Sequence, residues 1–585
     1  MRDPVLPAPD YKWSSARAQP WTRRPNLQPC TNEETMGERI ERVRWDLVNI
    51  TDFHKVRCSP QRYSRLQEFL ESELQALDKV QFDKYDQESK TDYILLRNFL
   101  RLKSRQLVQD AEKDQKVVPY LGVHLVIQLV RVIEARQRVD DMDGKRTAEM
   151  LVKVLEHIAM TKRQIVDGNE PEEATTALRA TKILRELQSH LQEWYAFYKD
   201  YDPLFTWWVS EPYLKLDKAL GDLSDTIKRA ALGIEPDDED TIIGEPVGRT
   251  GLLDALESEM IPYTPEELIE IGKKEYAWCE KEMHKAATKL GLESWRAALE
   301  KVKNDYVEPG LQPILVRDLT REAAEYVKKH DLVTVPKVCE ETITTFMMSP
   351  ARQKVNPFFL GGDEIIVSYP TSSMPHQDKL MSMRGNNKHF ARATVFHEMI
   401  PGHHLQMHYM KRVRPYRQMF FTPFCIEGWA FYWEVLLYAS DSWKKTPENR
   451  IGMLFWRMHR CARIVFSLKY HLGEMTAQEC VDLLVDWVGH ERATAEGEVR
   501  RSIMEAEYGP LYQAGYMLGG LQIWALRKEG VERMGEKKFH DLFLRANQMP
   551  VELFRALIED EKIGKDFESS WRFYEELEDR SGAED

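Results

Sequence analysis

The sequence predicts a mainly α-helical protein with a two-lobed body and one small β element in its second half. Apolar residues recur at three- and four-residue spacing through most of the chain, which is the period of an amphipathic helix. Runs that favour β-structure are rare, and the clearest is 364–369, closed by Pro370. The length of 585 residues exceeds the about 100–200 residues of one domain, so we expect several units that share a large core.

Composition divides the chain into four expected regions. An amino-terminal arm rich in proline and polar residues precedes a long helical region, and a segment rich in acids, glycine and proline separates this region from the rest. The expected limits are 1–35 for the arm, 36–233 for the amino-terminal helical region, 234–251 for the linker or loop, and 252–585 for the remainder.

Individual helices have clear sequence signals. YSRLQEFLESELQALDKV and DYILLRNFLRLKSRQLVQDAEK both place apolar residues on one face among charged ones. A later helix is expected to begin after Thr264, because this residue can cap, Pro265 suits the first turn and Glu267 completes a capping box. Helical periodicity resumes at about His389 and continues to the end.

Charge, hydropathy and cysteine usage limit the function. Net charge is −13 and no basic stripe is present, so we expect no nucleic-acid partner. No apolar run approaches the about 18 residues of a membrane span, and the amino terminus lacks an apolar signal-peptide segment. Seven scattered cysteines without a CxxC pair fit reduced thiols. We therefore expect a soluble cytoplasmic protein without membrane contact.

The octet HEMIPGHH contains the first candidate site. His397 and Glu398 occupy the first two positions of an HExxH zinc motif, in which two histidines four apart bind the metal and the glutamate faces its water. Position 401 is proline, and the next histidines are His403 and His404. Pro401 and the following glycine can distort a helix, so that His403 returns to the side of His397. The alternative is that His397 packs locally while the later histidines lie on the surface.

A second candidate motif, EGWAFYWE, begins 24 residues after His403. Glu427 and Glu434 are seven residues apart, so both can face one side of a helix. They stand among aromatic residues, where carboxylates are rare unless they are paired or bind a metal. An ordinary amphipathic helix with exposed acids is the alternative. Combined with the first motif, two histidines and one glutamate form a catalytic set for one zinc ion with an open coordination position.

The two motifs together, HExxPGHxxQ and EGWAxYxE, resemble the signature of the DUF885 family, which is related to gluzincin metallopeptidases. The resemblance extends from Tyr263 to Gly520. It implies a two-lobed, helical, metallopeptidase-like body with a central cleft and a catalytic region at 252–585. It implies that Glu398 is the general base and that the zinc ligands are His397, His403 and Glu427. The implied neighbours of the site are Glu434, which orients a ligand, Gln406 and His404.

The carboxy-terminal part of the resemblance is less regular. The stretch PLYQAGYMLG keeps Tyr516 of the family pattern but has Tyr512 where glutamine is usual. A tyrosine hydroxyl here can stabilise the oxyanion of an attacked carbonyl, and we expect Tyr516 in this role. A core tyrosine is the alternative. RCARIVFSLKYH keeps His471, a candidate for the cleft, but has Ser467 where an aspartate is more usual.

These residues predict a zinc-dependent hydrolase that cleaves amide bonds, with short peptides as expected substrates. Metal-activated water attacks the carbonyl and a glutamate carries the proton. The strand at 364–369, with Tyr369, is expected at the cleft edge, where it can pair with an extended peptide. One alternative is a zinc-dependent amide or ester hydrolase, or tailoring enzyme, of small-molecule metabolism. The other is a helical binding protein without catalytic activity.

Overall fold

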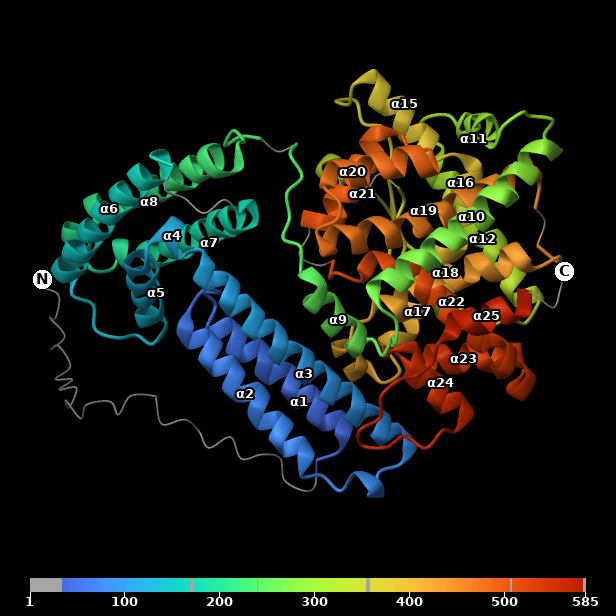
Figure 1. The fold of residues 1–585 in the computed structure, drawn as a ribbon, viewed down its shortest axis with the longest axis horizontal. Helices are drawn as coiled ribbons and strands as arrows, with labels where there is room; N and C mark the ends of the chain where they lie inside the picture. Colours follow the sequence, from blue (N-terminus) through green and yellow to red (C-terminus); the bar gives the residue numbers. More distant parts are fainter. Residues whose placement is uncertain are drawn as a thin grey trace, which may run out of the picture.

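A computed structural model describes residues 34–168, 173–238, 240–353, 358–443, 445–504 and 508–581. Residues 1–33 of the predicted arm lie outside this description. The described residues are mainly helical and contain only two short strands, which confirms the predicted fold class. Figure 1 shows a smaller helical lobe on the left and a larger body on the right.

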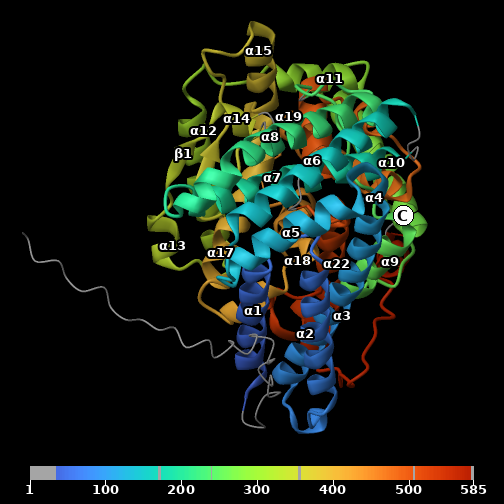
Figure 2. The same ribbon diagram turned by 90° about the vertical axis from the view of Figure 1, so that its left-hand side faces the viewer.

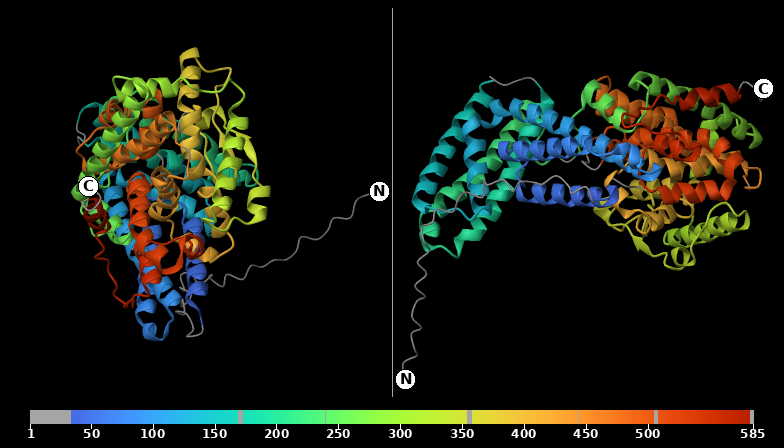
Figure 3. Two further views of the ribbon diagram at one scale, coloured as in Figure 1. Left: turned by 90° about the vertical axis from the view of Figure 1, so that its right-hand side faces the viewer. Right: turned by 90° about the horizontal axis from the view of Figure 1, so that it is seen from below.

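A bundle of three helices connects the two parts. Figure 3, seen from below, shows this bundle as a rod between the small lobe and the body. The predicted periodic segment at 92–113 lies within its third helix, and that at 63–80 lies in its second helix except for residues 79 and 80. The bundle consists of α1 (Met36–Phe53), α2 (Pro60–Asp78), the 3₁₀ turn η1 (Phe82–Lys84) and α3 (Gln87–Lys116).

The small lobe follows the bundle and lies in front of the body in Figure 2. Its interior is a separate hydrophobic cluster that includes Trp194, Phe205 and Leu216, all fully buried. Its elements are α4 (Val118–Leu121), α5 (Val123–Gln137), α6 (Gly144–Val166), α7 (Ala174–Lys199), α8 (Pro203–Ile227) and the π-helical turn η2 (Lys228–Leu232).

The body contains all later elements. They are α9 (Gly248–Ser258), α10 (Pro265–Lys289), α11 (Trp295–Lys303), α12 (Gln312–Lys329), α13 (Lys337–Glu341), β1 (Thr345–Met347), α14 (Pro350–Gln353), β2 (Ile365–Val367), α15 (His376–Gly385), α16 (Lys388–Glu398), α17 (His403–Met410), η3 (Pro415–Met419), α18 (Pro423–Ala439), α19 (Pro447–Leu472), α20 (Ala477–Leu483), η4 (Leu484–Val488), α21 (Arg492–Met504), α22 (Tyr512–Met534), α23 (Glu536–Ala546), α24 (Val551–Glu559) and α25 (Phe573–Ser581).

The two hydrophobic clusters do not follow the predicted limits of 36–233 and 252–585. Side chains of α1 to α3 pack into the larger cluster with the body, whereas α4 to α8 form the smaller one. Arg417 of the body is fully buried and binds Asp92 of α3 at 2.7 Å. The rod is thus tied to the body by apolar packing and by this ion pair. The domain limits themselves stay a prediction.

The described residues of the predicted linker, 234–238 and 240–251, lie between the lobe and the body. Its last four residues belong to α9, which begins at Gly248. Glu245 binds Arg179 of α7 at 2.9 Å, and Gly244 lies so close to Ile503 and Tyr470 that a Cβ would clash. The segment is therefore fastened both to the lobe and to the body.

The predicted helix start after Thr264 is the start of α10. The Thr264 hydroxyl accepts from the Glu267 amide at 3.3 Å, and the Glu267 carboxylate accepts from the Thr264 amide at 2.8 Å. This reciprocal pair is the predicted capping box at the start of α10. None of the helices in the described ranges combines the length and the apolar character that crossing a bilayer requires.

The predicted β element at 364–369 is the strand β2, which is shorter than expected. It pairs in parallel with β1, in register Thr345 with Ile365. On its other side, Ile366 exchanges two backbone hydrogen bonds with Leu360, at 2.8 and 2.9 Å. Both sides of β2 are therefore paired, which is at odds with the expectation that this strand offers an edge to a peptide. The outer edge belongs to β1.

Candidate metal centre

Three helices contribute the predicted metal ligands. His397 lies in the last turn of α16, His403 is the first residue of α17, and Glu427 lies in the second turn of α18. All three side chains are buried. The sequence predicted one distorted helix through both histidines, but the structure has two helices separated by a four-residue connection.

The connection at 399–402 turns the chain sharply enough to bring the histidines together. It contains a cis peptide bond between Ile400 and Pro401. A Cβ at Gly402 would lie 1.9 Å from the carbonyl oxygen of His397, so only glycine fits there. The indole nitrogen of Trp429 on α18 donates to the Pro401 carbonyl at 2.8 Å. This contact fastens the turn to the helix that carries Glu427.

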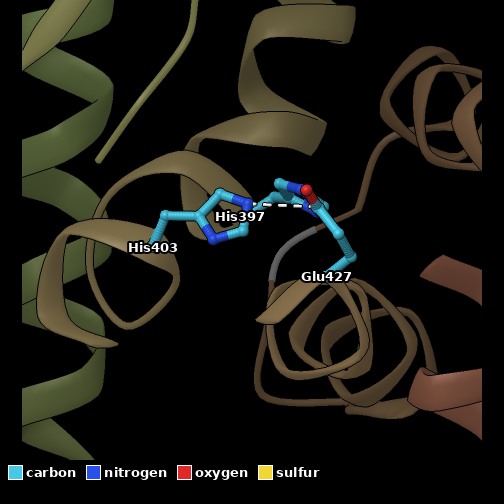
Figure 4. A group of neighbouring side chains, drawn as sticks. All are labelled: His397, His403 and Glu427. Atoms are coloured by element: carbon cyan, nitrogen blue, oxygen red, sulfur yellow. Dashed lines mark hydrogen bonds and ion pairs between the residues drawn. The ribbon is translucent and has the colours of Figure 1, made fainter. Parts of the chain in front are cut away.

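The three side chains converge on one point. The Glu427 Oε2 atom lies 3.3 Å from His397 Nε2 and 3.2 Å from His403 Nε2, and one ligand atom from each residue lies within 4.8 Å of the others. Figure 4 shows both imidazoles directed at the carboxylate. Ligands at about 2.0–2.1 Å from a tetrahedral zinc ion are roughly 3.3 Å apart. The donor types and the two distances to Glu427 therefore fit one zinc ion.

A buried carboxylate supports the first histidine from behind. His397 Nδ1 lies 2.9 Å from Glu434 Oε1, two helical turns after Glu427 on α18. Arg460 of α19 donates to the same oxygen at 2.7 Å. A carboxylate on the far nitrogen of a metal-binding histidine fixes the orientation and tautomer of the ring. Glu434 is placed for this role, and Arg460 balances its charge.

The charges of the cluster change the pKa values of its members. Burial disfavours the charged form of His397, but the carboxylates of Glu427 and Glu434 outweigh burial and raise its pKa to about 9. Burial also opposes ionisation of Glu427, yet His403 and His397 hold the pKa of this carboxyl well below its usual range. In the absence of metal, the group is thus an imidazolium–carboxylate pair.

Glu398, the predicted base, borders the cluster. It is the last residue of α16, directly after His397, and its side chain is half-buried. Its Oε2 atom accepts a hydrogen bond from the Gly361 amide at 2.6 Å. A Cβ at Gly361 would lie 1.9 Å from the Glu398 carbonyl oxygen. The absence of a side chain at 361 therefore permits the contact that orients the glutamate.

Helix α22 brings two tyrosines to the other side of the cluster. The Tyr512 hydroxyl donates to Glu427 Oε1 at 2.5 Å. The Tyr516 ring lies parallel to that of His397, with centroids 5.8 Å apart. Close packing of α18 on α22 permits this approach, because a Cβ at Gly428 would lie 2.8 Å from the Cα atom of Gly519.

A group of buried charges that the sequence reading missed lies beside Tyr516. The Arg463 guanidinium is 4.3 Å from the Tyr516 ring centroid and binds Glu498 at 2.6 Å. Arg501 binds the other oxygen of Glu498 at 2.7 Å. Burial opposes ionisation, but the two arginines lower the pKa of Glu498 to about 2. The sequence does contain a signal for this group: Arg460 and Arg463 stand three residues apart in an otherwise apolar run.

Four other predicted residues are placed outside the ligand group. His404 directs both ring nitrogens at carbonyl oxygens, those of Gly362 and Cys339. Gln406 donates to the Cys425 carbonyl at 3.1 Å and so joins α17 to α18. The Tyr369 backbone amide donates a hydrogen bond to Gln353 Oε1 at 3.2 Å.

His471 is the fourth of these residues. It lies near the end of α19, eleven residues beyond Arg460, or roughly 16 Å along the axis. Its Nδ1 atom accepts from the Val247 amide at 3.4 Å. Burial lowers the pKa of His471 to about 4, with a further effect of Lys113. The residue therefore seats the connecting segment and is not brought to the metal ligands.

Comparisons with known proteins bear on the whole chain. No curated protein matches. Two solved structures share the fold: "a putative lipoprotein of unknown function" from Shewanella oneidensis (TM-score 0.65, 16% identity, 90% of this chain and 100% of that chain) and "the putative lipoprotein" from Colwellia psychrerythraea (TM-score 0.56, 16% identity, 90% and 99%). The model of the family described as "Bacterial protein of unknown function (DUF885)" matches residues 52–558. Since this match spans most of the chain, the protein belongs to the DUF885 family.

Proposed function

We propose that this protein is a zinc-dependent hydrolase that cleaves amide bonds, with short peptides as substrates. The observation that carries the proposal is the convergence of His397, His403 and Glu427, with ligand atoms within 4.8 Å of one another. Glu398 stands directly beside this group. Three nitrogen and oxygen ligands leave one position of a tetrahedral ion open, as in catalytic zinc sites.

The donor set favours zinc over calcium and magnesium. Two imidazoles and one carboxylate suit zinc, whereas calcium and magnesium prefer oxygen ligands alone. When bound, zinc acidifies water and polarises a carbonyl group. The same ligand types and the adjacent glutamate support the further proposal of a relationship to gluzincin metallopeptidases.

Glu398 carries the proton in the proposed reaction. Its carboxylate accepts the proton of the attacking water and delivers it to the leaving nitrogen as the C–N bond breaks. The Gly361 amide bonds Oε2 and so limits the rotation of the carboxylate. The half-exposed position of Glu398 gives water and substrate access to it.

Tyr516 is the better placed oxyanion donor of the two tyrosines. The Tyr512 hydroxyl is already bonded to Glu427, whereas that of Tyr516 has no hydrogen-bond partner within the described ranges. Burial and the nearby Glu427 raise the pKa of Tyr516, although Arg463 opposes them. The hydroxyl therefore keeps its proton and can donate it to charge that develops on the carbonyl oxygen.

We also propose that the protein acts in the cytoplasm. Five of its cysteines are buried and unpaired, and Cys58 is unpaired and half-buried. Burial raises the pKa of Cys339 and Cys425 to about 12, so these thiols are unreactive. Such thiols are typical of reducing compartments.

Metal analysis and peptide hydrolysis test the proposal together. Purified protein is expected to contain one zinc per chain and to release products from a mixture of short peptides, and a chelator abolishes hydrolysis until zinc is returned. Glu398→Gln keeps the zinc and loses roughly 10²–10⁴-fold in kcat, whereas His403→Ala loses the zinc itself. A protein that neither binds zinc nor gains hydrolysis after zinc addition contradicts the proposal.

A further inference from the structure

A cavity of about 460 Å³ adjoins the candidate metal centre. It lies between α3, the end of α9, the segment from η3 into α18, and the start of α22. This size is within the range of about 300–1,000 Å³ that is usual for small-molecule sites. A larger cavity of about 950 Å³, beside α20, has acidic residues as half of its lining and includes no member of the metal centre.

The walls of the 460 Å³ cavity are mostly apolar. Phe99 and Leu102 line it from α3, and Phe420, Phe421 and Leu511 line it from the body. Polar groups on α3 also line it: Asn98, Lys103 and Gln106. Such a combination of an apolar interior with a few polar groups is typical of sites that hold an apolar substituent and orient it.

Tyr512 joins this cavity to the metal centre. Its side chain lines the cavity, and its hydroxyl donates to the ligand Glu427 at 2.5 Å. The ring of Tyr512 lies parallel to that of Phe421, with centroids 6.1 Å apart. Tyr512 thus borders the cavity and contacts the metal-facing carboxylate, so it is the residue that links the two spaces.

Glu259, the acidic residue in the wall of the cavity, is mostly uncharged at neutral pH and is therefore compatible with an apolar ligand. Glu259 accepts a hydrogen bond from the Thr422 hydroxyl at 2.5 Å. Burial raises the pKa of Glu259 to about 8, although the bond from Thr422 lowers it. The carboxyl is therefore mostly protonated at pH 7 and adds no charge to the wall.

We propose that this cavity is the specificity subsite of the hydrolase and takes a large apolar or aromatic side chain of its substrate. The inference rests on the proposed function, because it assumes that the substrate is attacked beside Glu427. It assigns the selection of substrate to residues of α3 and of the segment from Phe420 to Pro423. The connecting rod is then part of the active site as well as a support for the small lobe.

Substitutions on the two walls test the subsite. Leu102→Trp fills the cavity. Phe421→Ala removes an aromatic side chain from its wall, and because Phe421 is 52% exposed, this substitution is not expected to impair folding. Val108→Trp adds the same indole on α3 at a residue that is 47% exposed and does not line the cavity. Thermal unfolding transitions like that of the unmodified protein confirm that each variant is folded.

The probes are N-acetyl-Phe-Phe-amide and N-acetyl-Gly-Gly-amide, which place an aromatic side chain, or none, on either side of a peptide bond. Calorimetry with the full chain is expected to show tighter binding of the Phe-Phe probe. Leu102→Trp and Phe421→Ala weaken this binding at least tenfold, and Val108→Trp does not. Equal binding of both probes, or unchanged binding in Leu102→Trp and Phe421→Ala, overturns the subsite.

Hydrolysis of the same probes separates the subsite from the proposed function. Side-chain-selective binding that the two cavity variants weaken, without hydrolysis by any variant, supports the cavity as a binding site and contradicts the hydrolase. Hydrolysis that is equally fast for both probes and unchanged in Leu102→Trp supports the hydrolase and overturns the subsite.

Discussion

The Nδ1 atom of His397 lies 2.9 Å from the Glu434 carboxylate, while Nε2 of the same ring faces Glu427 at 3.3 Å. One imidazole thus connects two carboxylates of helix α18. Because the first contact occupies Nδ1, Nε2 is left for a metal ion. The second glutamate of EGWAFYWE therefore acts through a histidine of the other motif.

Glu434→Gln is expected to weaken zinc binding by about 10–100-fold, because the amide orients His397 less firmly and does not raise its basicity. Competition with a chromogenic chelator measures the affinity. Glu552→Gln is the matched control, since Glu552 is also buried and paired with an arginine, Arg555, outside the metal centre. Equal zinc affinity in both variants would show that Glu434 has no role in positioning the histidine.

Zinc affinity is expected to fall as pH is lowered from about 9. The pKa of His397 is raised to about 9 by Glu427 and Glu434 against the effect of burial, so the metal-free site holds a proton that zinc must displace. Release of one proton changes the dissociation constant about tenfold per pH unit. Chelator competition between pH 6.5 and 8.5 measures this slope, and a flat profile contradicts it.

The free energy of unfolding of the metal-free protein is expected to fall as pH rises, whereas zinc affinity rises with pH. The folded pKa of His397 is raised above its ordinary value of 6.5. Its ion pairs therefore stabilise the fold fully below about pH 6.5, and this contribution is lost as pH rises through about 9. Urea unfolding of chelator-treated protein at pH 6 and pH 9 measures the difference. His397→Gln, which lacks the titrating ring, should reduce it.

Tyr516→Phe and Tyr512→Phe are expected to have different effects. Loss of the Tyr516 hydroxyl should reduce kcat by roughly 10²–10³-fold, as for other oxyanion donors, with the zinc content unchanged. Loss of the Tyr512 hydroxyl removes the bond to Glu427 and should alter zinc affinity. Steady-state kinetics and metal analysis of both variants distinguish the roles. Unchanged kcat in Tyr516→Phe would exclude it as a donor.

Gly428→Ala is expected to destabilise the fold by about 1–3 kcal/mol, because the added Cβ would lie 2.7 Å from the carbonyl carbon of Gly519 and must push α22 away from α18. The same shift moves Tyr512 away from Glu427. Gly221→Ala in α8 is the matched control: nothing lies within 4 Å of its added Cβ, so the substitution should stabilise the helix by up to about 1 kcal/mol. Denaturant unfolding measures both, and equal effects would contradict close packing as the cause.

Local periodicity and capping signals in the sequence predicted where helices lie. The segments in α2 and α3 and the cap at Thr264 depend on contacts within one or two helical turns, which residue spacing specifies directly. The spacing also marked both histidines, Glu398 and Glu427 as one candidate group. The strand was placed correctly but was too long, because pairing with β1 and Leu360 limits it to three residues.

Contacts between distant segments were decided only by the tertiary structure. The sequence did not show that α16 and α17 are separate helices, that Arg460 lies against Glu434, or that Arg463 and Arg501 share one buried carboxylate. The cavity bordered by α3 and Tyr512 joins residues more than 400 positions apart. Spacing along a chain predicts which residues share a face of one helix. Which faces then meet depends on how the helices pack, and at α18 and α22 it depends on glycines that let two backbones touch.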